Sequence, residues 1–393
     1  MISTPKGFKL SVYGAGFRKA GRPDLALACS EVPAAAAGVF TQAAFKAAPV
    51  LVGQESIASG EPMRAVLVNS GQANACTGEE GVANCRATRE MIAREAGIDA
   101  ACVLPASTGV IGDQLRMDLW EKSVGPLVAG LGKASVEEFA RAIMTTDCFP
   151  KYSGRTVRLA GGEVTLAAAA KGAGMICPTM ATMISVVLCD AAVDAGTWQD
   201  MFARAVDVTF NRVSVDGDTS TNDTVYGLAN GASGVQAKGA DLEILEEAVT
   251  EVLAELAYML VQDGEGATKV LHIAVSGAAD AGDAEKVART VGHSQLVKTA
   301  MYGKDANWGR IVAAVGRSGA RFNAEDVRVS LGGVELFANG RPNAPDFDAL
   351  LKDTLESRDI YIEIVMGSGP GNYSFLASDL THKYVDINAA YRS

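Results

Sequence analysis

Segments with the periodicity of strands and of helices alternate along the whole chain, and this alternation limits the fold more than any other feature of the sequence. Residues 63–71 (MRAVLVNSG) form an apolar run that ends in an Asn/Gly turn, which is typical of a β-strand. Residues 81–99 then have the spacing of a helix that ends near Gly97. The clearest helix is expected over residues 241–262, where leucines and valines recur at helical spacing. The chain is therefore predicted to be a mixed α/β (α+β) protein, although these patterns do not give the strand order.

Local turn and cap signals agree with this mixture of elements. Ser135 and Glu138 are spaced as a capping box, which predicts the start of a helix. The Gly-Gly pairs at 161–162 and 332–333 each stand between two alternating runs, a pattern that predicts β-hairpins. No low-complexity linker and no fixed-period repeat separates one half of the chain from the other. Two interleaved lobes are therefore expected, in place of two tethered domains.

The charge balance argues against nucleic acids and membranes as partners. The 393 residues include 46 acidic and 35 basic ones, for a formal net charge of −11, and no Lys/Arg cluster offsets it. No apolar run approaches the ~20 residues that a membrane-spanning helix needs, and the first residues lack the apolar block of a signal peptide. The sequence therefore predicts a cytoplasmic protein with neither a nucleic-acid nor a membrane partner.

Cysteine and histidine usage argues against a disulfide framework and against a metal site. The seven cysteines are scattered without a C-x-x-C pair, and the three histidines have no metal-ligand spacing. Asp216, Asp218 and Asp223 resemble part of a calcium loop but lack the following Glu of an EF-hand, so they are expected to form turns. We therefore predict reduced thiols and no bound metal.

Four stretches are unusually dense in Gly, Thr, Asn and Asp while apolar strands bound them. They cover residues 69–78, 105–112, 171–190 and 214–224. Glycine lets backbone N–H groups approach a ligand, and hydroxyls supply acceptors and nucleophiles. Each stretch alone is best interpreted as an ordinary turn. Together, in a chain with three histidines, they favour an active site based on hydroxyl chemistry.

Thr182 is the most informative hydroxyl, because it begins a β-branched apolar run. A threonine hydroxyl is a weak nucleophile and needs a base. Scission of the Ala181–Thr182 bond would supply one, since the freed α-amino group titrates at about pH 8 and stands beside the hydroxyl. The alternative is that Thr182 is a β-forming residue in a core strand. The residues alone favour this plainer interpretation.

The sequence resembles the glutamate N-acetyltransferase family, also called the ornithine acetyltransferase family. The resemblance runs essentially from end to end, because nine segments match family motifs in the family order. These segments are GRPDLALACSEVPAAAAGVFT, NSGQANACTG, PASTGVIG, IMTTD, KGAGMICPTMATM, VDGDTSTNDT, DGEGATK, GKDANWGRI and DLTHKYVDINAAYRS.

The resemblance implies a self-cleaving enzyme whose fold is related to that of N-terminal-nucleophile aminopeptidases. Scission would give an α chain (1–181) and a β chain (182–393), associated as a heterotetramer of two α and two β chains. Thr182 would take the acetyl group of N²-acetylornithine, release ornithine, and pass the group to glutamate to give N-acetylglutamate. Such ping-pong transfer serves arginine biosynthesis and needs no cofactor. Whether acetyl-CoA also serves as a donor is left open.

The resemblance also assigns the remaining site residues. Thr108 and Gly109 correspond to the oxyanion hole, Lys171 to a contact with the substrate carboxylate, and Glu265 to a partner of the ornithine ammonium. The plainer interpretations are a turn, a solvated lysine and a loop carboxylate. Three further substrate contacts correspond to Thr145 (with Thr146 as the alternative), Asn388 and Ser393.

Departures from the family pattern leave acceptor specificity open. The family usually has Asn where this chain has Thr179, and Gly-Cys where it has Ala377-Ser378. A second enzyme class, an N-terminal-nucleophile amidase or aminopeptidase, shares the scission but passes the acyl group to water. A non-catalytic binding protein would instead keep the chain intact, at 40.7 kDa.

Overall fold

The computed structural model describes residues 2–18, 21–177, 183–343 and 347–390. The chain divides into two compact units, and each is described by itself. The first unit comprises Met1–Asn211 and Asp218–Leu260, and the second comprises Arg212–Gly217 and Val261–Tyr391. The short segment 212–217 is therefore separated in sequence from the rest of its unit.

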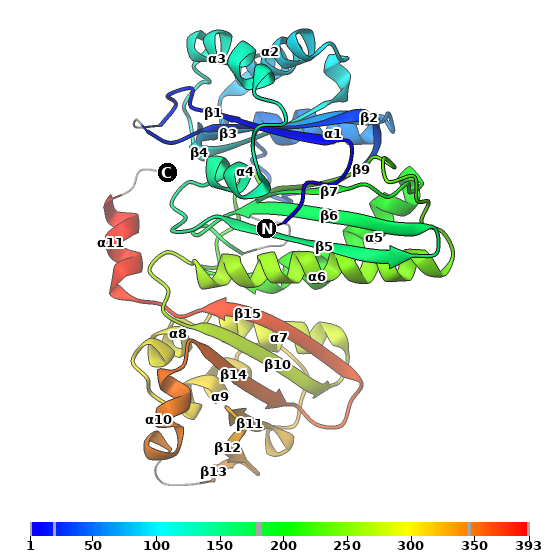
Figure 1. Ribbon diagram of the computed structural model, residues 1–393. Helices are drawn as coiled ribbons and strands as arrows, with labels where there is room; N and C mark the ends of the chain where they lie inside the picture. Colours follow the sequence, from blue (N-terminus) through cyan, green and yellow to red (C-terminus); the bar gives the residue numbers. More distant parts are fainter. Residues whose placement is uncertain (1, 19–20, 178–182, 344–346, 391–393) are drawn as a thin grey trace. The chain divides into compact units, whose positions relative to one another are not determined.

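One mixed sheet forms the centre of the first unit (Figure 1). Along the sheet, the strand order is β4-β3-β2-β9-β7-β6-β5, and β1 pairs with β2. Strand β7 runs parallel to β9 and antiparallel to β6. The strands are β1 (Phe8–Tyr13), β2 (Leu25–Phe40), β3 (Met63–Gln72), β4 (Val103–Val110), β5 (Lys151–Leu159), β6 (Gly162–Lys171), β7 (Ile184–Cys189) and β9 (Thr224–Ala229).

Helices cover this sheet and bury its apolar faces. Helix α4 packs on β1 and β6 through Val136 and Phe139. Helix α3 contributes Trp120 to a second core cluster, with strands β2 and β3. The helices are α1 (Ala48–Ala58), α2 (Gly78–Ala96), α3 (Met117–Ala129), α4 (Val136–Ile143), α5 (Ala195–Val208) and α6 (Ala240–Gln262), with 3₁₀ turns at Ala100–Cys102 and Phe210–Arg212.

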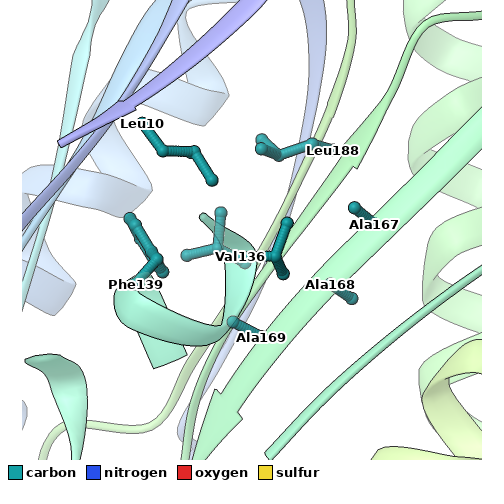
Figure 2. Close-up of a pocket in the computed structure, with 8 residues that line it drawn as sticks. Leu10, Val136, Phe139, Ala167, Ala168, Ala169 and Leu188 are labelled. Atoms are coloured by element: carbon teal, nitrogen blue, oxygen red, sulfur yellow. The ribbon is translucent and has the colours of Figure 1, made fainter. Parts of the chain in front are cut away.

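A small cavity lies where α4 meets the sheet (Figure 2). Its volume is about 10 Å³. A cavity of that size holds no more than about one water molecule. The lining is apolar and consists of Leu10, Val136, Phe139, Ala167, Ala168, Ala169, Val186 and Leu188. We interpret it as a packing defect that is too small for a substrate.

The second unit has its own sheet and its own core. The strand order is β13-β12-β11-β14-β10-β15-β8, and β8 comes from the segment that precedes residue 218. Strand β10 is parallel to β14 and antiparallel to β15. The strands are β8 (Val213–Ser214), β10 (Val270–Ala278), β11 (Arg328–Leu331), β12 (Val334–Ala338), β13 (Arg341–Pro342), β14 (Asp359–Val365) and β15 (Gly371–Ser378).

Short helices complete the second unit. They are α7 (Ala281–Gly292), α8 (Gln295–Tyr302), α9 (Trp308–Gly316), α10 (Asp348–Glu356) and α11 (His382–Ala390), with a 3₁₀ turn at Ala324–Asp326. A single cluster of buried residues joins α7, α8, α9 and α10 to strands β10, β11 and β14. Lys269 supports the end of α10 by donating to the carbonyls of Leu355, Glu356 and Ser357 (2.6–3.0 Å).

The expected local signals are present in the structure. Helix α2 ends at Gly97, which has the left-handed φ of 66°. Ser135 and Glu138 form the capping box of α4 in both directions. Both hairpins form, and the glycines at 332–333 have φ values of 55° and 81°. The mixed α/β architecture is therefore confirmed. Among the described residues, no helix combines the length and apolar character needed to cross a bilayer.

Candidate active site

Strand register brings two of the four Gly-rich stretches, 171–190 and 214–224, to one end of the first unit's sheet. Lys171, the last residue of β6, pairs with Ile184, the first residue of β7. Ile184 also pairs with Thr224, the first residue of β9. Because β6 runs antiparallel to β7, the end of β6 meets the start of β7 and the start of β9. Residues 171–172, 183–184 and 223–224 are therefore neighbours, although up to 53 positions separate them in sequence.

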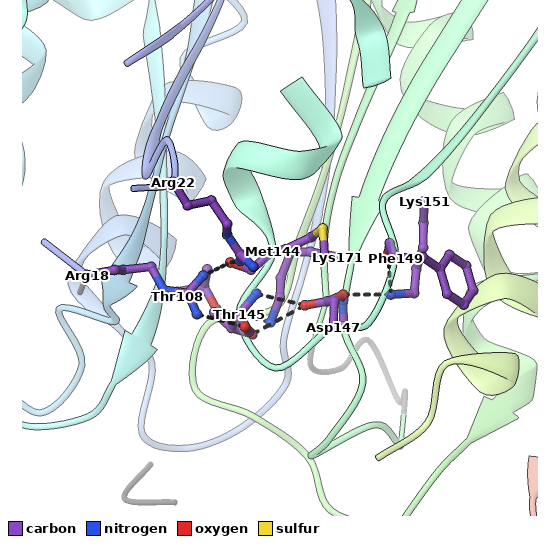
Figure 3. A network of polar contacts seen from close by, with 10 residues as sticks. Arg18, Arg22, Thr108, Met144, Thr145, Asp147, Phe149, Lys151 and Lys171 are labelled. Carbon is purple, nitrogen blue, oxygen red and sulfur yellow. Dashed lines mark hydrogen bonds and ion pairs between the residues drawn. The ribbon is translucent and has the colours of Figure 1, made fainter. Parts of the chain in front are cut away.

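Lys171 and Thr108 lie in contact at this end of the sheet. The Lys171 Nζ atom donates to Thr108 Oγ1 at 3.2 Å (Figure 3). Lys171 is 5% exposed and Thr108 is 8% exposed, so the pair is almost removed from water. Burial lowers the pKa of Lys171, and the nearby Asp147 carboxylate opposes that change. The structure thus brings these two predicted residues together, and Lys171 is not a solvated surface lysine.

Asp147 is the centre of a buried network that sequence reasoning missed. Its carboxylate accepts from Lys151 Nζ (2.7 Å), from the Gly172 N–H (2.7 Å) and from the Thr145 N–H (2.8 Å). Burial acts to raise the pKa of Asp147, but the Lys151 and Lys171 ammonium groups and the hydrogen bonds lower it overall. Asp147 is therefore an anion that fixes both the turn after α4 and the backbone just after Lys171. An acid four residues before a lysine was the available signal.

Two arginines hold the backbone beside Thr145 (Figure 3). Arg18 donates to the carbonyls of Met144 and Thr145, the latter at 2.7 Å, and Arg22 donates to the Met144 carbonyl at 2.7 Å. The Thr145 hydroxyl lies 3.5 Å from Asp147 Oδ2. Thr145 is thus connected to the network around Lys171. Sequence reasoning did not single out either arginine, because each lies more than 120 positions before its partners.

Gly109 stands where strands β3 and β4 come closest. Its φ is +136°, and an added Cβ would lie 2.2 Å from the backbone carbon of Gly71. A side chain therefore cannot fit without moving one strand away from the other. This close approach fixes the backbone next to Thr108, as an oxyanion site requires.

Asn222 joins the Gly-rich stretches 69–78 and 214–224 to the strand that carries Thr108. Its Nδ2 atom donates to the Ala73 carbonyl (2.6 Å) and to the Ser107 carbonyl (2.8 Å). The Ser107 hydroxyl in turn donates to Asn69 Oδ1 at 2.6 Å. Stretches 69–78 and 214–224 therefore support the site, since both hold the residue that precedes Thr108. Sequence reasoning expected a shaping role for them but could not assign it to a residue.

Asp223, next to Asn222, is a second buried carboxyl, and its pKa is shifted in the opposite direction to that of Asp147. It is 2% exposed, and burial raises its pKa well above the usual range. The Met183 N–H, the Thr41 hydroxyl and the Lys171 ammonium oppose that rise without cancelling it. Within the described residues, no group of three His, Cys, Asp or Glu side chains is placed to hold a metal ion. Burial thus favours the neutral form of the Asp223 carboxyl at the edge of this site.

Glu265 and Asn388 meet in the second unit. The Asn388 Nδ2 atom donates to Glu265 Oε2 at 2.8 Å and to the Tyr384 carbonyl at 3.0 Å. Glu265 is 8% exposed, so it is not a solvated loop carboxylate. The loop backbone also approaches α11 closely, because a Cβ on Gly266 would lie 2.8 Å from the Tyr384 nitrogen. The structure therefore brings these two predicted residues together.

The remaining predicted residues are Ala181, Thr182 and Ser393. All three lie outside the described residues. Met183, which follows Thr182 directly, is described and is buried, and its carbonyl accepts from the Thr224 N–H at 2.9 Å.

Comparison with known proteins gives the family. Residues 9–393 match the ArgJ family. The arginine biosynthesis bifunctional protein ArgJ of Nitratidesulfovibrio vulgaris is 64% identical over 393 residues, which is 100% of both chains. The protein of the same name from Syntrophotalea carbinolica is 47% identical over 392 residues, covering 98% of this chain and 99% of that one.

Solved structures include a relative with a bound ligand. The crystal structure of ornithine acetyltransferase from Mycobacterium tuberculosis, complexed with ornithine, is 39% identical, covers 46% of this chain and 94% of that chain, and has a TM-score of 0.42. The family match over residues 9–393 and the relative that is 64% identical over the whole length confirm the resemblance noted in the motifs. The chain belongs to the ArgJ family.

Proposed function

We propose that this protein is an acetyltransferase of arginine biosynthesis that moves the acetyl group of N²-acetylornithine to glutamate. The observation that carries the proposal is the buried Lys171–Thr108 contact at the sheet end where β7 begins, two residues after Thr182. Two ArgJ relatives are named as arginine biosynthesis proteins, and a related acetyltransferase binds ornithine. The small-molecule substrates are acetylornithine, ornithine, glutamate and N-acetylglutamate.

The Lys171–Thr108 contact suits a catalytic step at a carbonyl. Because the Lys171 ammonium donates to Thr108 Oγ1, the hydroxyl proton of Thr108 is left to point elsewhere. A hydroxyl donor beside a cation stabilises the oxyanion that forms when Thr182 attacks the acetyl carbonyl. The Gly109 N–H would be the second donor. The other two Lys171 protons can bind the carboxylate of an amino acid.

Scission between Ala181 and Thr182 would create the base that Thr182 needs. The nucleophile's hydroxyl proton passes to its own α-amino group as the ester forms, and ornithine leaves. Glutamate then attacks the acetyl ester, so that the two half-reactions share one nucleophile. In the second unit, the Glu265 carboxylate, oriented by Asn388, would pair with the side-chain ammonium of ornithine. Ser393 remains a proposed substrate contact.

The subunit composition is also part of the proposal. Strands β6 and β7 stay hydrogen-bonded across the proposed scission point, from Lys171–Ile184 to Leu166–Cys189. The α chain (1–181) and the β chain (182–393) would therefore remain associated, and we propose a heterotetramer of two of each in the cytoplasm. Native mass spectrometry would measure the composition.

A donor assay combined with intact-mass measurement tests the function. The purified protein should transfer acetyl from acetylornithine to glutamate, and denaturing mass spectrometry should find two chains that meet at 181/182. A parallel reaction with acetyl-CoA and glutamate decides whether this chain also acetylates glutamate from acetyl-CoA, which would make it bifunctional. The variant Thr182→Ala should remain one chain of 40.7 kDa and be inactive. Release of acetate without transfer would favour the amidase alternative, and an active Thr182→Ala protein would remove this residue from the mechanism.

A further inference from the structure

The backbone of Asp223 is held firmly beside the residue that follows the nucleophile. The Asp223 carbonyl accepts from the Thr41 N–H at 2.9 Å, and the next residue, Thr224, donates its N–H to the Met183 carbonyl at 2.9 Å. The β7–β9 register, in which Ile184 pairs with Thr224, places Asp223 level with Met183. Its position near the start of β7 is therefore set by main-chain hydrogen bonds on both sides.

The Asp223 carboxyl has polar neighbours, the Met183 N–H and the Thr41 hydroxyl, but its oxygens accept no hydrogen bond of normal geometry from the part of the chain that the structure describes. Both carboxyl oxygens are buried, and neither meets hydrogen-bond geometry with a neighbour. The nearby Thr41 hydroxyl does not serve, because it donates to the Ser220 carbonyl at 2.8 Å. Nearly all buried polar groups in proteins are paired, so an unpaired carboxyl is a costly exception that needs an explanation. A role as a turn residue does not supply one, since a turn would use the carboxylate as an acceptor.

The Lys171 ammonium, in turn, donates fewer hydrogen bonds than it can. An ammonium has three N–H donors. Within the described part of the chain it donates one hydrogen bond, to Thr108, from a site that is 5% exposed. Lys171 and Asp223 interact electrostatically, and each shifts the other's pKa toward its charged form, yet they are not bonded to each other. A buried cation with donors to spare and a buried carboxyl whose oxygens accept no hydrogen bond of normal geometry thus lie at the same end of the sheet.

An amino acid carries the two groups that this region lacks. Its carboxylate can accept from Lys171, and its α-amino nitrogen can bond to Asp223. The two substrates of the proposed reaction differ at that nitrogen, because acetylornithine has a neutral amide and glutamate has an ammonium. A neutral carboxylic acid suits the amide, and a carboxylate suits the ammonium. The protonation state of Asp223 would therefore have to change between the two half-reactions.

We propose that Asp223 is a catalytic residue that gives a proton to the α-nitrogen of the leaving ornithine and takes one back from the α-ammonium of glutamate. This inference rests on the proposed function. When the acetyl C–N bond breaks and the ester C–O bond forms, the leaving nitrogen gains two protons and leaves as an ammonium. One is the Thr182 hydroxyl proton, handed on by the Thr182 α-amino group, and the other comes from Asp223. In the second half-reaction the glutamate ammonium returns one proton to the Asp223 carboxylate. As the new C–N bond forms and the ester C–O bond breaks, a second proton returns to the Thr182 oxygen. The proton count then closes over one cycle.

The variant Asp223→Asn tests this proton exchange, because it keeps the shape of the side chain and cannot ionise. General acid–base groups contribute about 100- to 10,000-fold to rate. We expect kcat to fall within that range in both half-reactions, measured as single-turnover ornithine release and as acetyl transfer to glutamate, while the KM for acetylornithine changes little. The wild-type kcat/KM for acetylornithine should fall at high pH as Asp223 ionises, and that fall should be absent from the variant.

A matched control is Asp190, at the other end of β7. It is equally buried, but it accepts from the Lys6 N–H (3.0 Å) and the Thr165 N–H (2.7 Å). Asp190→Asn should lower the Tm and leave the pH profile unchanged. The pKa of Asp223 is raised in the folded state, so its contribution to stability is present in acid and is lost as pH rises. Asp223→Asn should therefore have a Tm at pH 8 no lower than that of the wild type.

Three outcomes would overturn the proposal. A folded, cleaved Asp223→Asn protein with wild-type kcat and pH profile would remove Asp223 from catalysis. A folded variant that stays uncleaved would assign Asp223 to scission. A loss of activity that merely follows a lowered Tm would assign it to structure. Failure of the proposed function is distinguishable from all three, because the wild-type protein itself would then transfer no acetyl group from acetylornithine to glutamate.

Discussion

At the scale of residues, the first unit's site depends on the Lys171 ammonium, which lies near the Asp147 carboxylate and contacts the Thr108 hydroxyl. Lys171 contacts the Thr108 hydroxyl directly, while Asp147 holds the Gly172 N–H that follows it in the chain. Asp147 also binds Lys151, so it divides its charge between two buried ammonium groups. Thr108 is therefore polarised by a lysine whose own position is fixed by its neighbours.

The variant Thr108→Val tests whether this hydroxyl stabilises the oxyanion. Valine keeps the shape and removes the donor, so kcat should fall about 100- to 1,000-fold. Thr108→Ser keeps the hydroxyl and should retain most of the activity, which makes it the matched control. Steady-state transfer from acetylornithine to glutamate measures both. Equal activity of the two variants would show that the hydroxyl takes no part in the rate-limiting step.

Some residues of this site could be predicted from the sequence and others could not, for a physical reason. Thr108, Lys171 and Glu265 stand within motifs that a family resemblance can align one by one. Arg18 and Asn222 act through bonds to residues more than 100 positions away, and no local pattern marks such a bond. Asp223 was assigned to a turn, because its burial without a partner is visible only in three dimensions.

At the scale of elements, helices and hairpins could be predicted from local signals, whereas the pairing of distant strands could not. The helix expected over 241–262 is observed as α6 (Ala240–Gln262), because its apolar spacing is complete within one segment. The Gly-Gly hairpins were predictable for the same reason. The order β2-β9-β7-β6 was not, since it places β9 between β2 and β7, and these three strands come from separate parts of the chain. Pairing of that kind depends on loop closure and core packing, which a local pattern does not encode.

The meeting of β3 and β4 gives a prediction at this scale. Gly109→Ala would place a Cβ 2.2 Å from the Gly71 backbone, at a φ of +136° that L residues avoid. Strain of this kind costs about 1–3 kcal/mol, and relief of the clash would move Thr108 away from Lys171. We expect a lower Tm together with a loss of transfer activity. Gly112→Ala is the control: its φ is also positive, +92°, but no atom lies within 4 Å of the added Cβ. If both variants lost activity equally, backbone strain would explain the result and the clash would not.

At the scale of the whole chain, the strand order explains how a cut protein would stay together. Strands β9 and β7 come from residues after 181, and they lie between β2 on one side and β6 on the other, which both come from residues before 181 (Figure 1). Two complete rows of hydrogen bonds, β2–β9 and β6–β7, therefore join the two sides of the proposed scission point. The expectation of interleaved lobes corresponds to this insertion of two strands, and it also predicts how separated fragments should behave.

Fragments 1–181 and 182–393 produced from separate genes should assemble into one active protein. Neither fragment can complete the sheet alone, because the first lacks its two inner strands and the second has those strands without their outer partners. Each would expose an apolar face, so we expect both to be insoluble when expressed singly and soluble when expressed together. The second fragment would need its starting methionine removed to expose Thr182. Copurification with acetyl transfer, and a single unfolding transition shared by both fragments, would support this account. Two independently folding fragments with separate transitions would contradict it, because interleaved strands cannot unfold one fragment at a time.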